Sequence, residues 1–146
     1  MTRDKALTGA AGAYYVGFRL SALGYAVGLT THGTRAIDMF VANPNTGKSI
    51  TIQTKTMVNA FVQSKKCEPY WKWPVGKSPP SPYDTFFYAF VDLRDDPSQT
   101  PDVFIVPSVR LDSLLSKFPN WQWCNIEKDN APEYKNRWDV IKDALA

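Results

Sequence analysis

The segment from residue 36 to residue 56 most constrains the fold, because it has the pattern of a β-hairpin. Residues 36–42 (AIDMFVA) and 49–56 (SITIQTKT) are rich in β-branched and apolar residues. Between them, NPNTGK carries proline and glycine in positions typical of a turn. A further strand pattern, YAVGL, covers residues 25–29. We therefore predict three antiparallel strands that follow one another in a sheet.

Two polar side chains occupy positions where a buried strand should carry apolar ones. Gln53 and Lys55 are two residues apart, so they point to the same face of the strand. Asp38 lies in the preceding strand, between two apolar residues, and the hairpin places it opposite the Gln53–Lys55 end. An isolated buried carboxylate is costly, so Asp38 needs a partner or a metal ion.

These groups suit a hard cation such as Mg²⁺. A carboxylate, an amide oxygen and a backbone carbonyl supply three oxygen ligands, and water completes the shell. A lysine beside the ion can orient or deprotonate a water molecule, or stabilise negative charge on a phosphate. Two simpler interpretations stay open. In the first, Asp38 caps a turn or forms a structural ion pair with Lys55. In the second, Gln53 and Lys55 face solvent on an edge strand.

The rest of the chain mixes helix and strand patterns, which predicts an α/β fold with a mixed central sheet flanked by helices. Apolar residues recur at helical spacing over residues 4–23, and Gly24 follows where a left-handed residue ends a helix. Residues 57–66 fit a short helix, and residues 67–83, with five prolines, are expected to be irregular. The remaining predicted elements are strands 84–93 and 103–107, a helix 108–118 with Ser108 as its N-cap, and a helix from Pro132 with Trp138, Ile141 and Leu145 on one face.

Length and composition exclude several classes of protein. The 146 residues and 44% hydrophobic content fit a single domain spanning residues 1–146. No segment reaches the roughly 18 apolar residues of a membrane span, and the first residues lack the apolar core of a signal peptide. Cys67 and Cys124 have no CxxC spacing, which argues against a zinc site or disulfide scaffold and favours a cytoplasmic protein. The net charge of +3 does not by itself indicate nucleic-acid binding.

The motifs resemble the PD-(D/E)XK nuclease superfamily. In that family a helix with a glutamate precedes a hairpin that carries an aspartate and then (E/Q)-x-K. Here Asp38 and Gln53-Thr54-Lys55 match, and the Q-x-K form is similar to that of Mrr-type restriction endonucleases. GAAGAYYVGFRLSALGYAV and FFYAFVDLRDD…PDVFIVPS look like the first helix and the later strands of small stand-alone members. The likeness covers residues 9–108.

The resemblance implies a restriction endonuclease-like core and metal-dependent hydrolysis of phosphodiester bonds in DNA. Asp38 and Gln53, helped by the carbonyl of Thr54, would bind Mg²⁺ or Mn²⁺. Lys55 would then serve the attacking water.

The chain departs from the family pattern at Ala13, where the helix glutamate is expected. Glu68 and Asp84 can replace that carboxylate only if the fold brings them near. A second function therefore stays open, namely a catalytically inactive nuclease-fold module that binds nucleic acid or a protein partner.

Basic and aromatic residues suggest surfaces for DNA, the expected partner. The candidates for phosphate contacts are His32, Arg35, Lys48, Lys65 and Lys66. A solvated charged face explains them equally well. The segments YWKWP and WQW mix aromatic residues with lysine, as surfaces for single-stranded nucleic acid do. Packing onto the sheet or a homodimer interface is the simpler explanation of these tryptophans.

Overall fold

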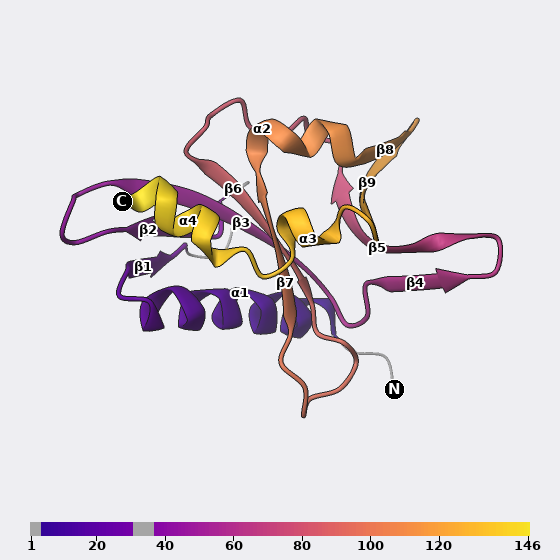
Figure 1. Ribbon diagram of the computed structural model, residues 1–146, viewed down its shortest axis with the longest axis horizontal. Coiled ribbons are helices and arrows are strands. Elements are labelled where there is room, and N and C mark those ends of the chain that lie inside the picture. Colours follow the sequence, from indigo (N-terminus) through magenta and orange to yellow (C-terminus); the bar gives the residue numbers. More distant parts are fainter. Residues whose placement is uncertain (1–3, 31–36) are drawn as a thin grey trace.

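The computed structural model describes residues 4–30 and 37–146, which form two β-sheets and flanking helices (Figure 1). The helices are α1 (Lys5–Ala22), α2 (Ser108–Leu111), α3 (Ala131–Tyr134) and α4 (Trp138–Leu145), with a short 3-10 helix, η1 (Asp112–Leu114). The strands are β1 (Ala26–Leu29), β2 (Met39–Ala42), β3 (Ser49–Met57), β4 (Phe61–Ser64), β5 (Cys67–Gly76), β6 (Phe86–Asp92), β7 (Asp102–Pro107), β8 (Leu115–Phe118) and β9 (Trp121–Glu127). None of the described helices has the length and apolarity needed to cross a membrane.

The first sheet has the strand order β1-β2-β3-β6-β7. Its first three strands are successive antiparallel neighbours, as the sequence predicts, with Met39 opposite Ile52. Strands β3 and β6 are parallel and β6 and β7 antiparallel, so the sheet is mixed, which confirms the prediction. Every residue of β6 is buried, because the strand lies between two others and is covered on both faces.

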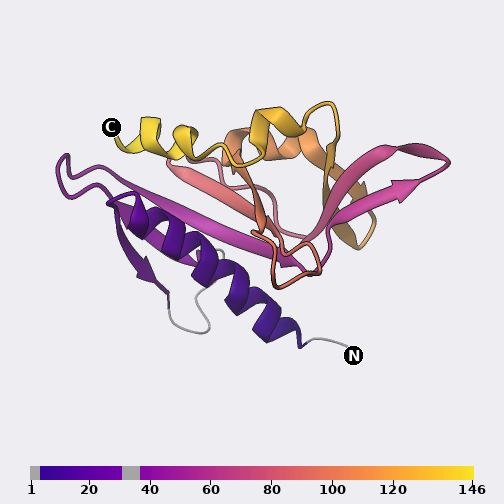
Figure 2. The same ribbon diagram turned by 60° about the horizontal axis from the view of Figure 1, so that its bottom comes forward.

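Helices α1 and α4 cover one face of the first sheet. Val16 and Leu20 of α1 share an apolar core with Trp138 and Ile141 of α4 and with strand residues such as Ile52. The predicted apolar face of the last helix is therefore confirmed. Figure 2 shows α1 running alongside β3, the strand that carries the Q-x-K motif.

The ends of α1 follow from its sequence. Before the helix, the carboxylate of Asp4 accepts a hydrogen bond from the backbone N–H of Ala6 at 2.7 Å. After it, Gly24 adopts the left-handed conformation predicted for it, with φ of 96°.

The other face of the first sheet is covered by a second, four-stranded sheet with the order β4-β5-β9-β8. Aromatic rings fill the space between the sheets. The ring of Trp73 lies 5.3 Å from that of Phe90 and 5.1 Å from that of Phe104. Its indole N–H donates to the carbonyl of Val91 at 2.9 Å, so the buried polar group is satisfied. Trp71 and Trp73 are thus core residues, and the packing interpretation of YWKWP is confirmed.

The second sheet contradicts the predictions for residues 61–76, whereas residues 77–83 are irregular, as predicted. In place of a short helix and an irregular segment, β4 and β5 form a hairpin. Proline obscured the strand pattern of β5. Because β4 pairs with β5 only between Cys67 and Trp71, the strand has a partner on one side only at Pro74. The missing N–H of Pro74 therefore costs no hydrogen bond on the open side.

The prediction of one helix over residues 108–118 is also wrong, because the helical conformation ends at Leu114 and β8 pairs with β9. Ser108 is the first residue of α2 rather than its N-cap, and its hydroxyl donates to the carbonyl of Ser81. The final helix is interrupted at Asn136, which has φ of 55°. Its backbone N–H donates to the carbonyl of Val103 and its side-chain oxygen accepts from the N–H of Val103, so this segment lies along β7.

Candidate active site

Asp38 immediately precedes β2 and is fixed beside β3 by hydrogen bonds. Its backbone N–H donates to the carbonyl of Ile52 at 2.9 Å. One carboxylate oxygen, Oδ2, accepts from the backbone N–H of Thr54 at 2.7 Å and from its hydroxyl at 3.1 Å. Asp38 therefore lies beside the Q-x-K segment, as the predicted hairpin requires. Two donors hold one oxygen of its carboxylate in a defined orientation.

Gln53 and Lys55 point to the face of the first sheet that the second sheet covers. In the parallel register of β3 and β6, Gln53 lies beside Tyr88 and Lys55 beside Phe90. Tyr88 and Phe90 both belong to the apolar core between the two sheets. Neighbours in register point to the same face, so the amide and the ammonium group both face this inter-sheet region.

The electrostatic environment of Lys55 is unusual for a lysine. Burial lowers the pKa of its ammonium group, and the negative charge of Asp38 raises it by a smaller amount. None of the ion pairs among the described residues joins Lys55 to Asp38. The structure therefore does not support the interpretation of this pair as a structural salt bridge. Asp38 instead acts on Lys55 through its charge, while its carboxylate binds Thr54.

A cleft of about 440 Å³ opens directly at Gln53 and Lys55. One wall consists of these residues and of Phe86 and Tyr88 on β6. The opposite wall is the end of β5 and the segment after it, residues 75–81. A volume of this order suits a small ligand or one nucleotide rather than a whole helix.

Two lining residues were not among the residues that the sequence predicted for the active site. Lys77 lines this cleft, and Trp121 lines an adjoining depression of about 240 Å³ together with Lys55. Both reach the site from the second sheet and its connections, which the sequence did not predict. The only signal for Trp121 was its place in WQW, and Lys77 carried none.

The sequence candidates for phosphate contacts are not brought together. Lys48 is exposed in the turn between β2 and β3, and Lys65 and Lys66 are exposed in the turn between β4 and β5. These turns lie at opposite ends of the molecule (Figure 1). His32 and Arg35 lie outside the described residues.

The two alternative carboxylates are placed away from the Lys55 end of β3. Glu68 lies at the start of β5, beside the exposed hairpin turn. Asp84 precedes Phe86, which pairs with Thr51, so it lies towards the beginning of β3. Within the described ranges, no group of three His, Cys, Asp or Glu residues could together hold a metal ion.

Helix α1 approaches β3 closely, but without a carboxylate. Ala13 packs at the edge of the apolar core, and Gly12 is buried against the side chain of Thr56. The helix thus packs on the face of the sheet opposite to the one that Gln53 and Lys55 face, and the position of the expected glutamate contributes only a methyl group.

The chain has the restriction endonuclease-like fold, with a mixed central sheet, as the sequence resemblance implied.

A solved structure of similar fold is the bacterial homing endonuclease I-Ssp6803I, with a TM-score of 0.62 and 16% sequence identity. The alignment covers 99% of this chain and 95% of the endonuclease chain. No protein-family model matches the sequence, and no curated protein matches it either.

Proposed function

We propose that this chain is a metal-dependent nuclease that hydrolyses phosphodiester bonds in DNA. The observation that carries the proposal is the position of a half-buried lysine of lowered pKa, between the fixed carboxylate of Asp38 and an open cleft. The likeness in fold to a homing endonuclease supports the same reaction class.

The donor set fits a hard divalent cation. Mg²⁺ is commonly held by one or two carboxylates together with water and substrate phosphate oxygens. Asp38 offers the carboxylate, while Gln53 and the carbonyl of Thr54 offer neutral oxygens nearby. Bound there, Mg²⁺ or Mn²⁺ would polarise the phosphate and lower the pKa of water.

Lys55 then has a clear role in the reaction. Because its pKa is lowered, a larger fraction of its amine is neutral at a given pH than in an exposed lysine. The neutral amine can accept a proton from the attacking water. The water oxygen bonds to phosphorus, the bond from phosphorus to the leaving sugar oxygen breaks, and that oxygen takes a proton from solvent. Lys77, on the opposite wall of the cleft, is placed to hold a phosphate by its charge.

Cleavage of plasmid DNA in Mg²⁺ or Mn²⁺ tests the proposal. Asp38→Ala and Lys55→Ala should each lower the cleavage rate at least about 100-fold, while Lys142→Ala, at an exposed position on α4, should not change it. Calorimetry should detect Mn²⁺ binding to the wild type and not to Asp38→Ala. Metal-dependent cleavage that survives Lys55→Ala would place the activity elsewhere on the chain or in a contaminant.

Two observations favour a second function, that of a nuclease-fold module without catalysis. Ala13 replaces the expected glutamate, and the described residues contain no cluster of three metal-binding side chains. DNA binding without metal-dependent cleavage in either cation would support this alternative.

A further inference from the structure

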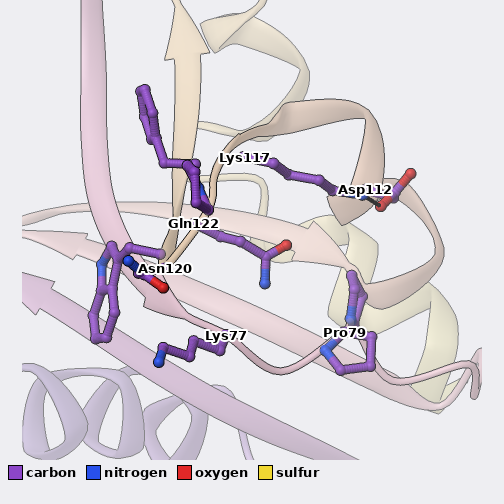
Figure 3. Close-up of a pocket in the computed structure, with 10 residues that line it drawn as sticks. Lys77, Pro79, Asp112, Lys117, Asn120 and Gln122 are labelled. Carbon is purple, nitrogen blue, oxygen red and sulfur yellow. Dashed lines mark hydrogen bonds and ion pairs between the residues drawn. The ribbon is translucent and has the colours of Figure 1, made fainter.

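The cleft at Lys55 continues into a longer groove on the second sheet. A depression of about 280 Å³ shares Lys77 and Pro79 with the cleft, and it shares Trp121 with the depression beside Lys55. Figure 3 shows Lys77, Asn120 and Gln122 around this pocket, which lies between the β8–β9 hairpin and the segment after β5. The three depressions therefore form one continuous surface that starts at the candidate catalytic lysine.

Hydrogen bonds hold the walls of this groove in place. The amide nitrogen of Gln122 donates to the carbonyls of Gly76 and Ser78, each at 3.2 Å. Gly76, with φ of 89°, lets the chain turn out of β5 at this point. The hairpin and the segment that carries Lys77 are thus tied together as one surface.

Two aromatic rings on this surface are open to solvent. Phe118 is 61% exposed and Trp121 is 44% exposed, and the two residues are paired across the β8–β9 hairpin. Exposed aromatic residues of this size are costly in water, whereas the tryptophans of β5 are buried. What sets this pair apart is that the two rings lie together at the depression, where they are accessible to a ligand.

Positive charge accompanies the rings. Lys55 and Lys77 lie along the groove, and Lys77 forms no ion pair with any described residue. Lys117 also lines it, although an ion pair of 2.9 Å with Asp112 neutralises much of its charge. Lysines for phosphates beside aromatic faces for bases are the features of surfaces that bind single-stranded nucleic acid.

We propose that this groove binds unpaired nucleotides of the DNA strand next to the phosphate at Lys55, with Trp121 stacking on a base and Lys77 contacting the backbone. Bases within a duplex are stacked on each other, so their faces are open to an aromatic ring only where the strand is unpaired. The preferred substrate is then DNA with a single-stranded extension or gap at the cleavage point. This inference rests on the proposed function for the placement of the strand, but its test does not require cleavage.

The test measures DNA binding in chelator by fluorescence anisotropy. The probes are a short oligo-dT, a blunt duplex, and the same duplex with an oligo-dT extension. Wild-type protein should bind the extended duplex more tightly than the blunt one. Trp121→Ala should weaken binding of oligo-dT and of the extended duplex at least about fivefold, and Trp121→Phe should retain most of the affinity. Lys77→Ala should lower the salt slope for oligo-dT by about 0.7.

Tyr14→Ala is the control, because Tyr14 is an exposed aromatic residue, 65% exposed, on α1 and outside the groove. Equal affinity of the wild type for blunt and extended duplexes would overturn the proposal. So would an unchanged affinity in Trp121→Ala, or self-association of the wild type that Trp121→Ala abolishes. If cleavage is absent but the Trp121-dependent preference is present, the nuclease function fails and this inference stands.

Discussion

Lys55 shows at the scale of one residue how function and stability compete. Burial removes water from its ammonium group, and the charge of Asp38 compensates for only part of that loss. The net lowering of its pKa means that folding disfavours the charged form. A lysine whose buried charge lowers the stability of the fold is better explained by a role in chemistry than by a role in structure.

Replacing Lys55 by Met should therefore raise stability at neutral pH. Since the folded-state pKa is below the ordinary value of about 10.4, the charge penalty is complete below the folded-state pKa and disappears above the unfolded one. The stability advantage of Lys55→Met should thus shrink as the pH rises towards about 10.4. Urea unfolding at several pH values measures it, with the exposed Lys142→Met as control. An advantage that does not change with pH would mean that burial of the charge is not its cause.

The sequence predicted which residues of the hairpin lie together at the candidate site, but not the residues that approach from elsewhere. Asp38, Gln53 and Lys55 were predicted to be neighbours because a short turn fixes which residues of a hairpin lie side by side. Lys77 and Trp121 approach Lys55 through the second sheet, whose strands pair over long sequence separations. No periodicity within β5 or β9 specifies that approach.

At the scale of elements, the contact between α1 and β3 depends on one missing side chain. A Cβ at Gly12 would lie 2.8 Å from Cβ and 2.9 Å from Cγ2 of Thr56, and closer still to its hydroxyl oxygen. Gly12 and Gly9 of this helix therefore have different packing environments. Gly12 allows close packing against the sheet, whereas a Cβ at Gly9 would meet no atom within 4 Å.

Gly12→Ala and Gly9→Ala should have opposite effects on stability. Gly12→Ala forces the helix away from β3 and should cost about 1–3 kcal/mol of unfolding free energy. Gly9→Ala should add about 0.5–1 kcal/mol, because alanine favours the helix and this position is open. Thermal or urea unfolding of both variants checks the pair. Equal effects in both would show that α1 does not contact β3 through Gly12.

The strands show why part of the fold cannot be predicted from the local sequence pattern. β3 was predictable because its β-branched residues alternate over a continuous run. β5 contains Pro69 and Pro74, which are typical of loops, and its strand conformation is set by pairing with β9, which is distant in the sequence: Tyr70 lies opposite Glu127. Tertiary pairing here outweighs local propensity.

At the scale of the whole molecule, the β4–β5 hairpin extends away from the body (Figures 1 and 2). Residues 63–68 at its tip are all exposed and include Lys65 and Lys66. Strand β5 connects this tip to Gly76 at the cleft. Its nine residue steps at about 3.3 Å each span roughly 30 Å, close to one turn of B-DNA at about 34 Å.

A duplex with one strand end in the cleft can therefore reach the hairpin only if it extends about nine base pairs from that end. A two-stranded ribbon of this kind fits the major groove, where lysines contact phosphates.

The double variant Lys65→Ala/Lys66→Ala should weaken binding of a 20-base-pair duplex and lower its salt slope by about 1.8, at roughly 0.9 per phosphate contact. It should leave binding of a 6-base-pair hairpin duplex with an oligo-dT extension unchanged, since that DNA ends before the tip. Anisotropy titrations at several salt concentrations, with Lys142→Ala as control, measure both effects. If the double variant weakens the short and long duplexes equally, the hairpin does not act as a distant arm, and if it weakens neither, Lys65 and Lys66 belong to a solvated surface.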